Sequence, residues 1–103
     1  MQNFLIGLPA FNEENNINKL LDRIDNLKPL FGKRLFVLVV NDRSTDNTES
    51  ILKEYVKNFN YITYINHSKN MGLGKAMNTI LKYAVNNFDE NDIVRLEDNY
   101  GRR

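Results

Sequence analysis

The segment RLFVLVV, residues 34–40, runs directly into the polar segment NDRSTDN, residues 41–47. A strand that is apolar on both faces is typical of the centre of a parallel sheet, where helices cover either side. The polar residues that follow predict a loop, in which Thr45 or Asp46 caps the next helix. This part of the chain therefore predicts a buried parallel strand with a polar loop at its carboxyl end.

Strand and helix patterns alternate on both sides of this segment. Residues 3–8 predict a strand that stops at Pro9, and Asn12 is the expected N-cap of a helix that Pro29 ends. Helical stripes follow from Ile51 to Phe59 and from Leu73 to Val85. Strands are expected at 61–65 and 93–96. The order β-α-β-α-β-α-β predicts an α/β fold, a Rossmann-like, mostly parallel sheet with helices on both faces, in one domain over residues 1–103.

Composition excludes several classes of protein. The 103 residues include 14 Lys and Arg against 13 Asp and Glu, with 42% hydrophobic residues and no cysteine. This balance predicts a globular protein that does not bind nucleic acid, and it excludes disulfides and thiol chemistry. The longest apolar run, 35–40, is far shorter than a membrane span, and no signal peptide is evident. The expected location is the cytoplasm.

Polar loops follow all four expected strands, where open α/β sheets bind their ligands. These loops are residues 9–14, 41–46, 67–75 and 97–99, of which three carry carboxylates and one carries glycines and lysines. Individually, such residues are also common in helix caps and turns. The pair Gly72 and Gly74 lacks the third glycine of a dinucleotide fingerprint, but a helix opening there can hold a phosphate, with Lys75 adding charge. His67 has no partner at a suitable spacing and receives no role.

Four motifs in this order resemble those of family 2 glycosyltransferases. LPAFNEENNI at 8–17 resembles the opening of that family, and VVNDRSTDNT at 39–48 resembles its Val-Asp-Asp-Gly-Ser-Thr-Asp segment. NMGLGKAMN at 70–78 resembles its Asn-x-Gly-x-Gly-x-Ala-x-Asn helix entry. The sequence of this motif is most similar to that of the polyprenyl-phosphate, dolichol-phosphate-mannose-synthase-like branch of the family. IVRLEDN at 93–99 lies where the family has its metal-binding Asp-x-Asp.

The resemblance implies the N-terminal, nucleotide-binding half of a GT-A fold. The implied reaction is transfer of a hexosyl group, with inversion, from a UDP- or GDP-sugar donor. Asp42 is expected to contact the base, and Glu97 and Asn99 to hold Mg²⁺ or Mn²⁺, which neutralises the departing diphosphate. The nucleotide-binding residues implied are Pro9, Ala10, Phe11, Glu13, Val40, Asp42, Gly72, Lys75 and Asp98.

The sequence departs from the family pattern at three places. Asn41 replaces the first acid of the Asp-Asp pair, and Arg43 replaces its usual glycine. Glu97-Asp98-Asn99 replaces Asp-x-Asp. Since an asparagine is a neutral and weaker ligand than a carboxylate, we expect either reduced metal affinity or Asp98 as the ligand.

In the family, the acceptor pocket and the catalytic base lie in the C-terminal half. Residues 1–103 therefore predict a donor-binding part that does not catalyse transfer alone, with no catalytic residue assigned. The acceptor is left open between a lipid phosphate and a glycan, and a lipid acceptor would bring the protein to the inner face of the membrane. The alternative is a non-catalytic nucleotide-binding or interaction module. The exposed edge of the last strand also predicts self-association.

Overall fold

The computed structural model describes residues 2–97, in which four strands alternate with three α-helices. This order confirms the expected α/β fold. The elements are β1 (Phe4–Ala10), α1 (Ile17–Phe31), β2 (Leu35–Asn41), α2 (Thr48–Asn58), β3 (Ile62–Asn66), α3 (Leu73–Asn87) and β4 (Ile93–Leu96), with a short 3₁₀ turn (Gly32–Arg34) before β2.

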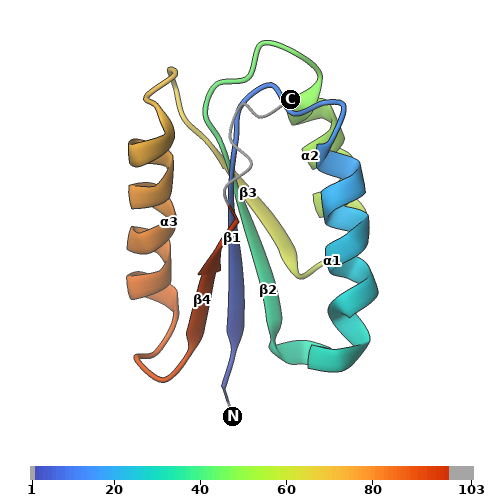
Figure 1. Cartoon of the computed structure of the whole chain (residues 1–103), viewed down its shortest axis with the longest axis vertical. Coiled ribbons are helices and arrows are strands. Elements are labelled where there is room, and N and C mark those ends of the chain that lie inside the picture. The colour runs from blue at the N-terminus through green and yellow to red at the C-terminus, as the bar shows by residue number, and fades with distance from the viewer. Residues whose placement is uncertain (1, 98–103) are drawn as a thin grey trace.

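The four strands form one parallel sheet in the order β3-β2-β1-β4. Helices α1 and α2 cover one face and α3 covers the other (Figure 1). The chain builds outward from β1 through β2 to β3, then returns through α3 to the opposite side of β1. The carboxyl ends of β1 and β4 therefore form the topological switch point, where α/β sheets open a crevice.

Two apolar cores hold the layers together. On one face, Leu21 and Leu52 of α1 and α2 pack with the β2 residues Val37 and Val39. On the other face, Ile80 of α3 packs with residues of β1 and β2. Strand β2 contributes buried side chains to both cores, as its two apolar faces predict.

The prediction that the first strand stops at Pro9 is wrong, because β1 continues to Ala10 and Pro9 pairs with Val40. The carbonyl of Gly7 accepts from the amide of Glu97 on the β4 side, whereas the carbonyl of Ala10 accepts from Asp42 on the β2 side. By this alternation the Pro9 nitrogen faces the β4 side, beyond the last strand pair, Gly7–Leu96. The missing N–H thus removes no bond to β2.

The prediction of a helix that starts after Asn12 is also wrong by four residues, since α1 begins at Ile17. Asn12 has φ 53°, in the left-handed region that asparagine tolerates. The backbone N–H groups of residues 12–14 donate to the side chains of Ser44 and Asp46 in the loop after β2 and of Thr48 at the start of α2. With this left-handed backbone Asn12 does not cap a helix, and the i to i−4 hydrogen bonds begin only with the Ile17 amide, which donates to the Glu13 carbonyl at 2.8 Å.

The prediction that Pro29 ends this helix is wrong as well, because α1 continues past Pro29 to Phe31. Gly32, with φ 62°, follows the helix, and its N–H donates to the carbonyl of Lys28. Proline is tolerated at this position because only Leu30 and Phe31 of the helix follow it.

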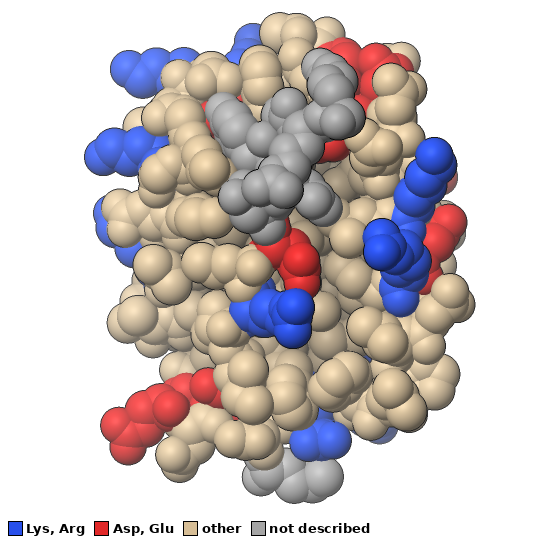
Figure 2. All heavy atoms as spheres, in the orientation of Figure 1, with Lys and Arg blue, Asp and Glu red and all other residues tan. Residues whose placement is uncertain are grey.

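None of the helices within residues 2–97 combines the length and apolar character needed to cross a membrane. On the face drawn in Figure 2, the charged side chains of the described residues are scattered, with both signs present.

Candidate functional site

The loops after β1 and β2 are joined by reciprocal hydrogen bonds. The Asn12 amide donates to Ser44 Oγ at 3.0 Å, and the Thr45 amide donates to Asn12 Oδ1 at 2.8 Å. The Glu13 amide donates to Thr48 Oγ1 at 2.9 Å in a buried bond. Because each loop satisfies backbone groups of the other, the two loops form one unit at the carboxyl edge of the sheet.

Asp46 supports this unit from the start of α2. Its carboxylate accepts from the backbone of Thr48 at 2.9 Å and from the backbone of Glu14 at 3.2 Å. Partial burial alone would raise the pKa of Asp46, but hydrogen bonds from the side chain and backbone of Thr48 and from Glu14 lower it below its ordinary value. The expectation that Thr45 or Asp46 is the N-cap is wrong, because Asn47 holds that position without a side-chain cap hydrogen bond. Asp46, one residue earlier, accepts from the amide of the first helical residue, Thr48.

Asp42 joins the loop after β3 to this unit. Oδ1 accepts from the Met71 amide at 2.9 Å and Oδ2 accepts from the Gly72 amide at 2.8 Å, while His67 Nδ1 lies 2.7 Å from Oδ1. The loops after β2 and β3, which lie 25 or more residues apart in the sequence, therefore meet at one carboxylate. Gly72 directly precedes α3, so the carboxylate also faces the positive end of that helix.

The Asp42 side chain is completely buried. Its two oxygens are used by the protein itself, so this carboxylate organises the loops. The expected contact between Asp42 and the nucleotide base stays a prediction, and it would require the 71–72 turn to share or release these oxygens.

Three other residues predicted to bind nucleotide also have buried side chains. Pro9 and Ala10 lie in β1, and Val40 belongs to the core beneath α3. A ligand at this edge can reach these residues only through their backbone groups. Glu13 is buried as well, with 3% exposure, whereas Phe11 beside it in the same loop is half-buried.

The α3 end of the edge presents Gly72 and Lys75. Gly72 has φ 92°, a conformation that strongly favours glycine, and no atom lies within 4 Å of where its Cβ would be. Lys75 is exposed in the first turn of α3. The Met71 and Gly72 amides already serve Asp42, so the exposed ammonium of Lys75 is the cationic group this turn offers to an anion.

Glu97 lies directly after β4, at the switch point. Its Oε1 is 2.8 Å from Arg95 Nε, and its side chain is 36% exposed. Asp98 and Asn99 lie outside the described residues. Within residues 2–97, no group of three or more His, Asp or Glu side chains is arranged to hold a metal ion. Glu97, the residue of the expected metal motif that the structure describes, offers carboxylate oxygens of the type that Mg²⁺ and Mn²⁺ prefer.

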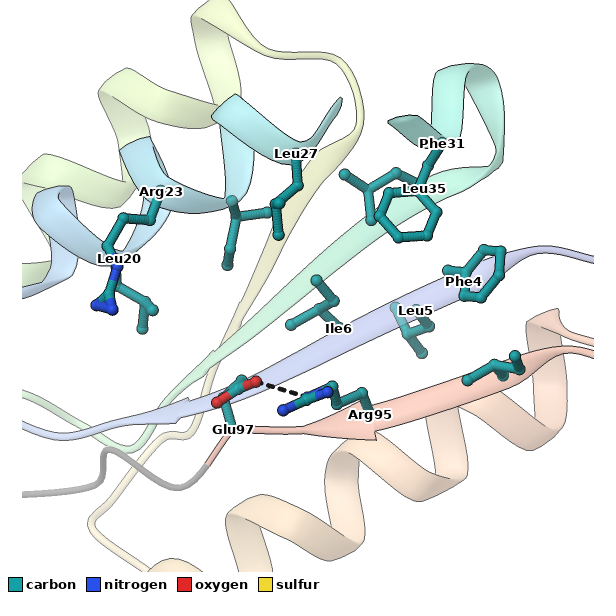
Figure 3. Close-up of a pocket in the computed structure, with 12 residues that line it drawn as sticks. Phe4, Leu5, Ile6, Leu20, Arg23, Leu27, Phe31, Leu35, Arg95 and Glu97 are labelled. Atoms are coloured by element: carbon teal, nitrogen blue, oxygen red, sulfur yellow. Dashed lines mark hydrogen bonds and ion pairs between the residues drawn. The ribbon is translucent and has the colours of Figure 1, made fainter. Parts of the chain in front are cut away.

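Two hollows adjoin this edge. The larger, about 600 Å³, lies between α1 and the β1–β4 half of the sheet, with Phe4 and Phe31 toward one end. Figure 3 shows the bonded pair Arg95 and Glu97 at the other end, across from Leu20 of α1. A smaller hollow of about 410 Å³ lies between the loops after β2 and β3. The larger hollow reaches the switch point, since Glu97 is one of the residues that line it.

His67 is the residue whose role sequence reasoning missed. It follows β3, directly beside the end of β2, and its amide donates to the carbonyl of Asn41 at 2.9 Å. Spacing along the chain gave it no partner, because its partner Asp42 is 25 residues away. The pairing of His67 with Asp42 could have been predicted from their places after β3 and β2, because loops after neighbouring parallel strands meet at one edge of the sheet.

Comparison with known proteins agrees with this geometry. The pattern of "Glycosyl transferase family 2" matches residues 5–88. The chain is 35% identical over 94 residues to an uncharacterized protein of Methanocaldococcus jannaschii, covering 90% of this chain and 38% of that protein. It is 38% identical over 78 residues to a dolichyl-phosphate beta-glucosyltransferase of Saccharomyces cerevisiae, covering 70% of this chain and 23% of that enzyme.

Two solved structures share the fold. A mannosyltransferase from Pyrobaculum calidifontis, in complex with GDP-Man and Mn²⁺, matches 80% of this chain with a TM-score of 0.72 and 27% identity, covering 24% of that protein. Residues 1–349 of Staphylococcus aureus TarS, in complex with UDP, match 96% with a TM-score of 0.73 and 28% identity, covering 28% of that protein.

The chain thus spans less than two fifths of the length of each of these four proteins. The family pattern covers most of this chain, and the cross-linked loops lie where the sequence resemblance placed its motifs. This chain belongs to glycosyl transferase family 2.

Proposed function

We propose that residues 1–103 form the donor-binding part of a glycosyltransferase that transfers a hexosyl group from a UDP- or GDP-sugar. The observation that carries this proposal is the meeting of three loops at the carboxyl edge of the sheet, in a chain of this family. Asp42 joins the loops after β2 and β3, and reciprocal hydrogen bonds of Asn12 join the loops after β1 and β2. A cross-linked loop edge beside a switch point suits a ligand that must be held in one orientation.

The donor would lie across this edge with its parts matched to the chemistry of each loop. Half-buried Phe11 offers an apolar ring for the base, and the Pro9–Ala10 backbone offers hydrogen-bonding groups for base and ribose. The Lys75 ammonium would pair with the diphosphate, since a cation at a helix start adds to the field of the helix.

A divalent metal would be held by Glu97 together with Asp98 and Asn99. The Glu97 carboxylate fits the oxygen donors that such an ion takes. When bound, Mg²⁺ or Mn²⁺ would neutralise charge that develops on the departing diphosphate. Glu97 must exchange its Arg95 partner for the metal, which predicts weaker metal affinity than a free carboxylate would give.

The two solved relatives support a nucleoside-diphosphate donor without selecting its base, because one holds GDP-Man and the other UDP. We therefore test both nucleotides. Inversion, the acceptor and the need for a further acceptor-binding part belong to the same proposal, in which this chain alone does not catalyse transfer. A lipid-phosphate acceptor, as the name of the yeast relative indicates for that enzyme, would place the protein at a membrane surface.

Calorimetry with UDP, GDP and their hexose conjugates, with and without Mn²⁺, tests the proposal. We expect one nucleotide series to bind, with affinity enhanced by Mn²⁺. Lys75→Met should weaken binding about tenfold, the loss of one charge-assisted contact. Lys82→Met is the matched control, because Lys82 is also exposed on α3 but two turns further from the edge. Equal losses in both variants, or no binding of either nucleotide, would refute the donor site.

A non-catalytic nucleotide-binding module is the second candidate. The ion pair between Arg95 and Glu97 favours it, because this pair occupies the one described carboxylate of the metal motif. In that case nucleotide binding would be insensitive to Mn²⁺, and Glu97→Gln would leave the affinity unchanged.

A further inference from the structure

His67 bridges two elements of the sheet edge through a buried imidazole. Nδ1 lies 2.7 Å from Asp42 Oδ1 and Nε2 lies 2.8 Å from Thr79 Oγ1 in α3, and the His67 side chain is only 8% exposed. Each ring nitrogen therefore has a partner, and the ring is held between the end of β2 and the second turn of α3.

The proton on Nδ1 can be assigned from its partner. Asp42 Oδ1 and Oδ2 already accept from the Met71 and Gly72 amides, as an ionised carboxylate does. A carboxylate can only accept, so His67 Nδ1 must carry the proton of this bond. His67 thus supplies a third donor to a carboxylate that is shut off from water.

That third donor determines how firmly Asp42 can hold the 71–72 turn. A buried carboxylate that loses a donor regains solvation only if its surroundings open. The groups best able to move are those of the turn at residues 70–72, which is largely exposed. Movement there displaces Gly72 and the first turn of α3, where Lys75 is located.

We propose that His67 is a positioning residue of the donor site. Through Asp42 and Thr79 it fixes the turn before α3, so that Lys75 meets the donor diphosphate in a set position. This inference rests on the proposed donor site, because it assigns to His67 a consequence for nucleotide affinity.

The test begins with the nucleotide-free chain in solution. Nitrogen-15 NMR should show a protonated Nδ1 on His67, and the Met71 and Gly72 amides should exchange slowly. In His67→Phe, which keeps a planar ring but removes both nitrogens, exchange at these two amides should accelerate about tenfold, equivalent to about 1.4 kcal/mol. His67→Asn is the conservative variant, because its amide N–H can replace Nδ1–H as a donor to Asp42. It should restore protection within about threefold, less than about 1 kcal/mol.

Nucleotide affinity separates positioning from a purely structural role. We expect His67→Phe to weaken UDP or GDP binding about tenfold and His67→Asn to recover most of it. Thr79→Val should have an intermediate effect, because it removes the Nε2 partner but leaves the Asp42 bond. If His67→Phe does not fold, the Nδ1 assignment and the two milder variants carry the same test.

Three results would overturn the inference. An unprotonated Nδ1 would contradict the assigned bond, and unchanged amide exchange in His67→Phe would show that His67 does not hold the turn. Faster exchange with unchanged nucleotide affinity would leave His67 a structural residue only. If the wild-type chain binds neither nucleotide, but the Met71 and Gly72 amides still exchange faster in His67→Phe, the proposed donor site is wrong. In that case the role of His67 in holding the turn still stands.

Discussion

Replacement of Gly7 by alanine should destabilise the protein by over-packing the contact between β1 and α3. A Cβ on Gly7 would lie 2.4 Å from Ile80 Cγ2, 3.1 Å from Ile80 Cδ1 and 3.2 Å from Leu96 Cδ2. Carbon atoms in contact are normally about 3.5–4.0 Å apart. Ile80 is fully buried, so it cannot turn toward solvent, and α3 must move away by about 1 Å to restore that spacing.

Over-packing of this size lowers the free energy of unfolding by about 1–3 kcal/mol. For a domain of this length, that corresponds to a fall in Tm of about 10 °C. Urea unfolding followed by circular dichroism measures the change directly. Gly74→Ala is the matched control, since Gly74 lies within α3 and no atom is within 4 Å of its Cβ position. That variant should be more stable by up to about 1 kcal/mol, from helix propensity.

Second substitutions at Ile80 identify the responsible atom. Ile80→Leu removes Cγ2, so Gly7→Ala combined with Ile80→Leu should be more stable than the sum of the two single effects predicts. Ile80→Val keeps Cγ2 and should give no such rescue. The reasoning is refuted if Gly7→Ala is as stable as the wild type, or if the Leu and Val backgrounds behave alike.

Three further outcomes are expected. Burial, and then the hydrogen bond and charge of Asp22, raise the pKa of Tyr55 to about 12. Its contribution to stability is therefore complete below about pH 10 and lost as the pH rises through about 12. Absorbance at 295 nm should show this late titration, and Asp22→Asn should bring it earlier. Because the pKa of Asp46 is lowered, its contribution is present above its ordinary value near 3.8 and lost as the pH falls through the folded value. Asp46→Asn, which exchanges a charged acceptor for a neutral one, should thus destabilise by about 1 kcal/mol at pH 7 but much less at pH 2, by thermal unfolding. Ile93, 43% exposed on the edge strand β4, should promote self-association, which light scattering would detect and Ile93→Lys should reduce. A concentration-independent wild-type monomer would contradict that expectation.

Much of the candidate site was visible before the structure. Residues 8–17, 39–48 and 70–78 carry the family motifs, and their loops meet at one edge as parallel strands require. The internal use of Asp42 was not visible, because the Met71, Gly72 and His67 donors come from a loop 25 or more residues away. The residue types in a motif show which charged and hydrogen-bonding groups are present. Only the packing of the folded chain shows which partners those groups bind.

The strand at 34–40 and the helical stripes could be read from the chain alone, because hydrophobic periodicity is a local property. Tertiary contacts decided two of the mispredicted boundaries. Pro9 stays in β1 because its nitrogen faces the β4 side of the strand, where the pairing of β1 with β4 has already ended at Gly7 and Leu96. Residues 12–14 stay out of α1 because Asn12 takes a left-handed backbone conformation, which the side chains that follow β2 hold through the amides of residues 12–14. Periodicity records which residues avoid water, whereas the choice between competing hydrogen-bond partners depends on which segments the folded chain brings within reach.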